Sequence, residues 1–127
     1  RDLKNVVMLP PVNRDKLVVH YAEADVLFLH LADIPAFHKV LPSKIFEYST
    51  YNRPILAGAS GVAKQFLNDN VTASFVFDPS DLSGAKEKIE KILSFDQLID
   101  RSEFISKYTR SNIMAEMIKS IATCYAS

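Results

Sequence analysis

Residues 42–58, PSKIFEYSTYNRPILAG, carry the clearest structural signals in the chain. The first half of this segment predicts a helix that begins near Ser43 and ends near Asn52, because Pro54 cannot continue a helix and favours extended backbone just before it. The second half, from Ile55, is a short apolar run typical of a buried strand. The segment therefore predicts a helix that leads directly into a strand of a sheet.

Short apolar runs recur on both sides of this segment, with regions of helical spacing between them. The runs are nearly continuous, which is typical of parallel strands that helices cover on both faces. Helices are expected after Asn13, a preferred N-cap residue type, within residues 62–67, and from residues 78–82 onward. The expected strands occupy residues 6–9, 26–29, 55–57 and 75–77.

After the last expected strand, the chain carries only helical spacing. Apolar residues recur at three- and four-residue intervals within residues 82–93, 95–108 and 111–125. A chain of 127 residues suffices for one domain with its own core. We therefore predict a single α/β domain over residues 1–127: a doubly wound, Rossmann-like parallel sheet with C-terminal helices.

Composition argues against several classes of protein. Fifteen Lys and Arg residues balance fifteen Asp and Glu residues, so no net charge attracts nucleic acid or an anionic membrane. No apolar run approaches the roughly 18 to 20 residues that span a bilayer, and no signal-peptide pattern is present. The one cysteine, Cys124, cannot form an internal disulfide. We therefore expect a cytoplasmic protein.

The loop after the run at 26–29 is where we expect a ligand, because open parallel sheets bind ligands at the carboxyl ends of their strands. Pro42 and Ser43 start the next helix and leave backbone N–H groups free for phosphate oxygens, while Lys44 adds a positive charge. Glu47 lies one turn further on the face of Ser43, where its carboxylate can accept hydrogen bonds from sugar hydroxyls. This arrangement fits a ribose diphosphate.

The same residues also have a purely structural interpretation. Ser43 is a common helix cap and Pro42 a common helix starter. Lys44 and Glu47 are equally compatible with a solvated helix face. Spacing alone leaves both interpretations open.

Sequence motifs along the chain favour the ligand-binding interpretation of these residues. LPSKIFEYS at 41–49 and NRPILA at 52–57, with ADVL at 24–27, GASG at 58–61 and FDPSD at 77–81, cover most of the chain. Together they resemble the donor site of the glycosyltransferase group 1 family. The likeness is strongest to a bacterial subgroup that attaches amino sugars or deoxysugars during O-antigen and capsule synthesis.

The resemblance implies a two-domain GT-B architecture, in which a C-terminal Rossmann-like half binds the nucleotide-sugar and an N-terminal half presents the acceptor. This chain resembles most of the C-terminal half, and it begins with Arg1 rather than methionine. The family's glycine-rich turn and basic pyrophosphate loop have no counterpart in it. We therefore expect a domain truncated on its N-terminal side and inactive alone. We also expect it to self-associate through its first strand or terminal helices.

The resemblance also assigns roles to individual residues. Glu47 matches the glutamate that binds the nucleotide ribose, and residues 42–44 match the phosphate-facing helix start. Pro10, Pro11 and Val12 match the loop that borders the base. Lys39 stands where the family has a glutamate, eight positions before Glu47, and is a candidate contact for donor phosphate or sugar. No catalytic residue is assigned.

The function expected from the resemblance is sugar transfer from a nucleoside-diphosphate sugar to a glycan or lipid-linked acceptor, in the cytoplasm or at the inner membrane surface. It implies no cofactor beyond this donor, and His20 and His30 lack metal-ligand spacing. His38 has a side chain suited to proton transfer but stands in a loop. Two alternatives stay open. One is a GT-B-type nucleotide-sugar epimerase. The other is a non-catalytic Rossmann-like interaction domain, favoured by Lys39 and Val62 at positions that are acidic in the family.

Overall fold

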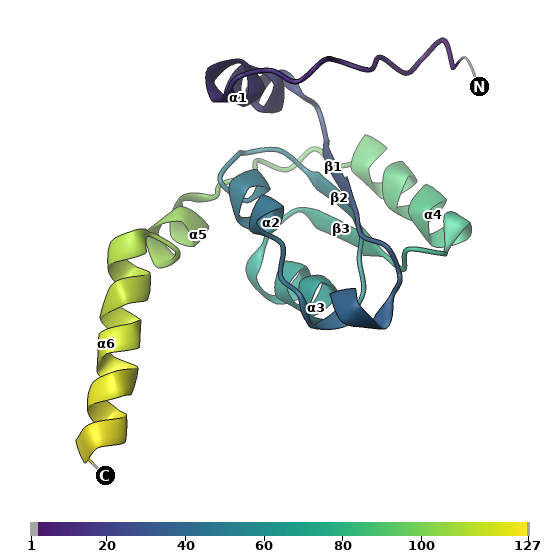
Figure 1. Cartoon of the computed structure of the whole chain (residues 1–127). Coiled ribbons are helices and arrows are strands. Elements are labelled where there is room, and N and C mark those ends of the chain that lie inside the picture. Colours follow the sequence, from purple (N-terminus) through teal and green to yellow (C-terminus); the bar gives the residue numbers. More distant parts are fainter. Residues whose placement is uncertain (1–2, 127) are drawn as a thin grey trace.

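The computed structural model describes residues 3–126, which form an α/β fold around a three-stranded parallel sheet (Figure 1). In chain order the elements are α1 (Arg14–Glu23), β1 (Leu27–His30), the 3-10 helix η1 (Pro35–Lys39), α2 (Ser43–Tyr48), β2 (Ile55–Gly58), α3 (Gly61–Asn70), β3 (Ser74–Phe77), α4 (Leu82–Leu93), α5 (Ser102–Lys107) and α6 (Arg110–Ala126). The strands lie in the order β1-β2-β3, joined by helical crossovers. The expected parallel α/β arrangement is confirmed and is consistent with a Rossmann-like fold.

The core lies between the sheet and the helices α2 and α3. Leu29 of β1, Ala57 of β2 and Val76 of β3 are neighbours in register and belong to one buried cluster. Ile45 of α2 and Leu67 of α3, both fully buried, join the same cluster. This packing fixes α2, which carries Ser43, Lys44 and Glu47 of the predicted site, against the sheet.

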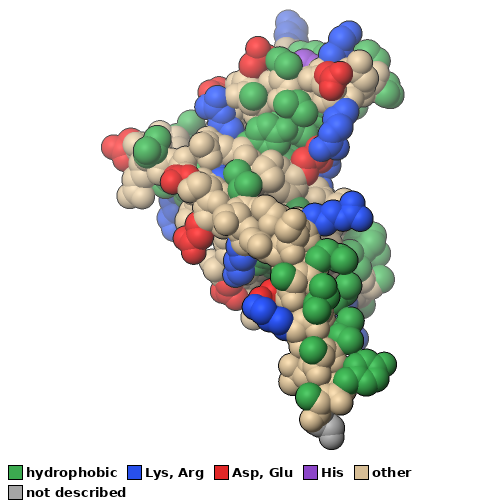
Figure 2. Space-filling model, turned by 90° about the vertical axis from the view of Figure 1, so that its left-hand side faces the viewer, with side chains coloured by type: hydrophobic (Ala, Val, Ile, Leu, Met, Phe, Trp, Pro, Cys, Tyr) green, Lys and Arg blue, Asp and Glu red, His purple; other side chains and the backbone are tan. Residues whose placement is uncertain are grey.

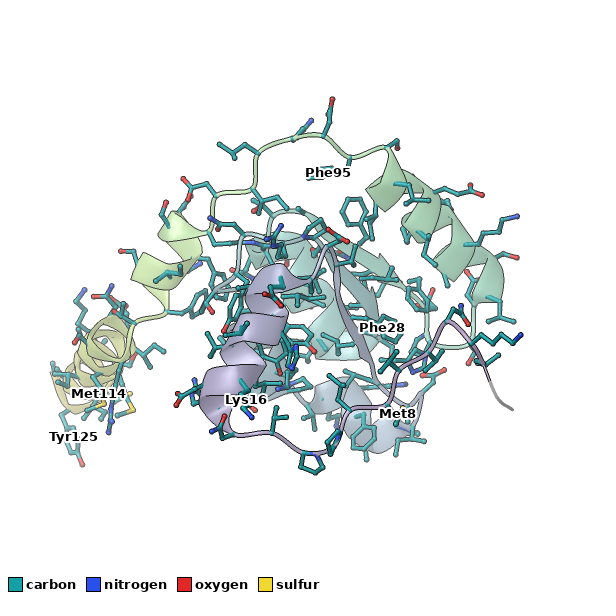
Figure 3. All side chains as sticks on the ribbon, turned by 90° about the horizontal axis from the view of Figure 1, so that it is seen from above. Met8, Lys16, Phe28, Phe95, Met114 and Tyr125 are labelled. Atoms are coloured by element: carbon teal, nitrogen blue, oxygen red, sulfur yellow. The ribbon has the colours of Figure 1, made fainter. Side chains whose placement is uncertain are left out.

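The other face of the sheet is covered only in part. α4 contacts β3 and β2. Phe95, which follows α4, meets Phe75 of β3 edge to face with ring centroids 5.6 Å apart (Figure 3). Phe28 of β1 is exposed, because β1 is an edge strand whose residues alternate between buried and exposed. Helices therefore cover both faces near β2 and β3, but one face of β1 stays open.

The prediction of a strand at residues 6–9 is wrong. These residues form no strand and are exposed, Met8 to 88%. Figure 1 shows the segment running from α1 above the strands, without joining the sheet. A strand is stable only when a neighbour supplies hydrogen-bond partners for its backbone. Within residues 3–126, β1 pairs with β2 alone, so the run at 6–9 leaves the outer edge of β1 unpaired and lies outside the sheet.

The helix within residues 42–58 is shorter than expected. α2 ends at Tyr48 rather than near Asn52. The hydroxyls of Ser49 and Thr50 donate to backbone carbonyls in the preceding turn, at 2.7 and 2.8 Å. These bonds satisfy carbonyl groups at the helix end and compete with its continuation.

The helix expected at residues 95–108 forms only over its last part, as α5. Arg101 connects the residues before α5 to the turn after α2. Its side chain is almost completely buried. Its backbone N–H donates to Asn52 Oδ1 at 3.2 Å, and its Nη2 donates to the Arg53 carbonyl at 3.0 Å. Burial lowers the pKa of Arg101 to about 10. These long-range contacts hold the residues before α5 in a non-helical conformation. A continuous helix would break the contacts.

α6 projects from the body and touches it through α5 (Figures 1 and 2). Figure 3 labels Met114 and Tyr125 on this helix, which lies apart from the sheet. Its apolar side chains are exposed: Ile113, Met114, Met117, Ile118, Ile121 and Tyr125. In the part of the chain described, no helix combines the length and apolar character needed to cross a membrane.

Gly61 at the start of α3 is the glycine whose replacement the fold tolerates least. Its φ is +59°, and an added Cβ would collide with the backbone carbonyl of His38 in η1. Gly61→Ala is therefore expected to lower the free energy of unfolding by at least about 1 kcal/mol, measured by urea denaturation. The control Val62→Ala, an exposed neighbour, should change it by no more than about 0.5 kcal/mol. Equal losses in the two variants would contradict this account of η1.

Candidate functional site

The carboxyl ends of the strands form one edge of the sheet, and the segment leaving β1 at this edge carries Lys39 and Pro42 of the predicted site and leads into α2. β1 continues through η1 to the start of α2, and α3 begins directly after β2. η1 packs against α3, which folds the loop after β1 over this edge. α2 therefore starts where open parallel sheets bind their ligands.

The start of α2 has backbone N–H groups without acceptors. Pro42 is the N-cap and supplies no side-chain acceptor, and its carbonyl accepts the N–H of Ile45 at 3.1 Å. The N–H groups of Ser43 and Lys44 have no acceptor within residues 3–126. Because α2 has only six residues, its dipole is small, and these local donors and the exposed Ser43 hydroxyl are what an anion would meet.

Lys44 and Glu47 form an ion pair on α2. Lys44 Nζ donates to Glu47 Oε2 at 2.7 Å and to the hydroxyl of Tyr21 in α1 at 2.9 Å. The Glu47 side chain is 22% exposed. Among the described residues, no hydrogen bond reaches its second oxygen, Oε1. That oxygen can accept a hydrogen bond from a ligand hydroxyl.

The electrostatics of this group favour a fixed positive charge. The hydrogen bond to Glu47 raises the pKa of Lys44, the bond to Tyr21 raises it further, and the opposing effect of burial is smaller. Burial also raises the pKa of Tyr48, whose ring lies beside them. At neutral pH the ammonium therefore stays charged and the Tyr48 phenol stays neutral.

An apolar hollow adjoins the start of α2. It has a volume of about 230 Å³ and is lined by Leu31, Phe37, Val40 and Pro42. Pro42 thus lies between this hollow and the free N–H groups of the helix start. The arrangement places an apolar wall beside hydrogen-bond donors, which is the usual make-up of a small-molecule site.

The other predicted site residues are less closely joined to this group. Lys39 ends η1 and is exposed, in the loop that leads to α2. Pro11 is exposed and Val12 half-buried in the segment before α1. Within the described chain, no hydrogen bond or ion pair connects Pro11 or Val12 to α2. The structure therefore groups residues 42–44 and 47, with Lys39 on the adjoining loop.

Sequence reasoning missed a polar cluster beside this site. His38 Nε2 and Asp33 Oδ1 are hydrogen-bonded at 2.8 Å, and the Ser60 hydroxyl approaches the same oxygen at 3.4 Å. Asp33 precedes His38 by five residues in the same loop, which was the available signal. Ser60 is the N-cap residue of α3, so only the fold brings it near. The cluster ties η1 to the start of α3.

Within residues 3–126, no three His, Cys, Asp or Glu side chains are grouped to hold a metal ion. The groups available for chemistry at the start of α2 are thus hydrogen-bond donors, one ammonium and one carboxylate. They can bind a phosphate and a hydroxylated ring. Searches with the sequence and the fold found no matching family model, curated protein or solved structure.

Proposed function

We propose that this chain is the donor-binding part of a glycosyltransferase, which moves a sugar from a nucleoside-diphosphate sugar to a glycan or lipid-linked acceptor of a cell-surface polysaccharide. One observation carries the proposal. α2 starts at the carboxyl edge of a parallel sheet with free N–H groups beside an apolar hollow, and it carries the Lys44–Glu47 pair within its next turn. A nucleoside-diphosphate sugar needs these kinds of group together.

The parts of the donor are matched to these groups by their chemistry. A phosphate oxygen accepts hydrogen bonds from the N–H groups and hydroxyl at Ser43, with the charge of Lys44 close by. A ribose hydroxyl donates to Oε1 of Glu47. The apolar hollow beside Pro42 receives a less polar face of the donor. Lys39 on the adjoining loop, and Pro11 and Val12 before α1, remain proposed outer contacts.

The same groups contribute to the transfer step. When the bond between the sugar's anomeric carbon and the diphosphate oxygen breaks, the electron pair stays on the diphosphate. Donors already aimed at this oxygen stabilise the growing negative charge without reorganising. The acceptor hydroxyl forms the new bond to the anomeric carbon and loses its proton to a base. We assign that base to no residue of this chain.

The proposal includes a GT-B architecture, with a second Rossmann-like domain that presents the acceptor. Uncovered apolar side chains at residues 6–9 and along α6 support a contact surface for further protein. We propose that the chain alone has no transferase activity. We also propose that it self-associates through these surfaces. The full-length protein is proposed to act in the cytoplasm or at the inner membrane surface.

The proposed activity is tested on the full-length protein with a panel of nucleoside-diphosphate sugars and a membrane extract that supplies acceptors. Release of the diphosphate together with a glycosylated product is the expected result. Conversion of the donor sugar without release of diphosphate would instead identify an epimerase. Absence of any binding to the panel would favour a non-catalytic interaction domain.

A further inference from the structure

Lys44 lies beside tyrosines from two helices. Its ammonium nitrogen lies 5.3 Å from the ring centre of Tyr21 in α1 and 5.7 Å from that of Tyr48 in α2. The Tyr21 hydroxyl also accepts a hydrogen bond from it at 2.9 Å. The hydrogen bond to the phenolic oxygen places the ammonium beyond the hydroxyl edge of the Tyr21 ring rather than over its face, so Tyr21 holds Lys44 through its hydroxyl.

Tyr21 is itself held by ring packing. Its ring meets Tyr48 edge to face with centroids 5.2 Å apart, and Tyr51 edge to face at 5.5 Å. Such pairs constrain ring orientation as well as burying apolar area. The hydroxyl of Tyr21 is therefore presented to Lys44 in a defined direction, although 23 residues separate them in the chain.

This fixed ammonium determines how Glu47 is oriented. Its bond to Oε2 is 2.7 Å long, which leaves Oε1 as the oxygen without a partner in the described chain. A lysine side chain on a helix surface has several rotamers of similar energy, and the Lys44 side chain is 41% exposed. Without the hydrogen bond to Tyr21 of α1, the Lys44 ammonium would alternate between Glu47 and water. The carboxylate would then lose its single orientation.

We propose that Tyr21 is a positioning residue for donor binding: by holding Lys44 against Glu47, it directs the free carboxylate oxygen of Glu47 toward the donor ribose. This inference rests on the function proposed above. It makes α1, which contributes no ligand group of its own here, a determinant of donor affinity. A binding site is more effective when neighbouring groups fix its ligand-contacting side chains in advance.

Tyr21→Phe isolates the hydroxyl, since the phenylalanine ring keeps the packing with Tyr48 and Tyr51. We expect it to weaken nucleoside-diphosphate binding by about three- to tenfold, the range for one lost hydrogen bond. Tyr51→Phe is the matched control, because within residues 3–126 its hydroxyl makes no hydrogen bond to Lys44 or Glu47. It should leave affinity unchanged. Thermal melting of both variants checks that the fold is retained.

A double-mutant cycle with Glu47→Gln decides whether Tyr21 acts through Glu47. The titration uses the full-length protein and whichever of uridine, guanosine, thymidine, adenosine and cytidine diphosphate binds it most tightly. The proposal expects Tyr21→Phe to weaken binding when Glu47 is present but to have no further effect in the Glu47→Gln variant. An equal loss in both backgrounds, or no loss in either, would overturn the positioning role. If Glu47→Gln binds as well as the unmodified protein, the proposed function itself fails.

Discussion

Glu47→Ala is expected to weaken nucleoside-diphosphate binding by at least tenfold in the full-length protein. A carboxylate that accepts hydrogen bonds from ribose hydroxyls contributes about 1.5 to 3 kcal/mol for each bond, before water compensates. The substitution removes both oxygens and leaves Lys44 without its ion-pair partner. Calorimetric titration of the unmodified and variant proteins measures the change.

The same substitution should change stability much less. The pair it breaks is partly exposed, with side-chain exposures of 41% for Lys44 and 22% for Glu47, so its loss should cost no more than about 1 kcal/mol. Glu116→Ala is a control, because Glu116 forms a comparable ion pair with Lys119 at three-residue spacing in α6, away from the site. Unchanged affinity in Glu47→Ala would make Glu47 a solvated helix residue. A much lower melting temperature would make it structural.

Ile45→Ala is expected to destabilise the domain by about 2 to 5 kcal/mol in urea denaturation. Ile45 is fully buried, and its side chain belongs to the cluster that joins α2 to the sheet. A helix of six residues has little stability of its own, so this packing is what holds α2 in place.

Ile45→Val is the graded control for this prediction. It removes one methylene group and should cost about 0.5 to 1.5 kcal/mol. A loss below about 1 kcal/mol in Ile45→Ala would show that α2 is anchored by something other than this core. Ile45 is two residues from Glu47, so comparing Ile45→Val with Glu47→Ala separates changes in folding from changes in binding.

Within residues 42–58, the helix start and the strand were predicted correctly because local rules govern them, whereas the helix ends before the predicted position. A helix-start signal and an apolar run place both elements without reference to the rest of the chain. The N-cap at Asn13 was predictable for the same reason, and its side chain accepts the N–H of Lys16 at 3.1 Å. Where helix capping and hydrophobic periodicity determine the backbone conformation, the sequence alone predicts the element.

Two of the failures, at residues 6–9 and 95–101, depend on distant parts of the chain, whereas the early end of α2 has a local cause. The apolar run at 6–9 has the composition of a strand, but a strand also needs a neighbour. The path before α5 depends on Arg101 reaching Asn52 and Arg53, far back in the sequence. Periodicity carries no information about such contacts.

The candidate site shows the same division. Ser43, Lys44 and Glu47 were proposed from local spacing at a helix start, and α2 starts at the carboxyl edge of the sheet. The contact between Tyr21 and Lys44 was not predictable, because it depends on how α1 packs against α2. The approach of Ser60 to Asp33 likewise depends on the tertiary fold.

Titration of the full-length protein with the five common nucleoside diphosphates, each beside its parent nucleoside, is the sharpest test of the proposed donor site. If the start of α2 holds a donor diphosphate, at least one diphosphate should bind saturably. The parent nucleoside should bind at least tenfold more weakly, since it lacks the phosphates that meet the helix start. Absence of binding by all five diphosphates, or equal affinity for diphosphate and nucleoside, would contradict the assignment of this site.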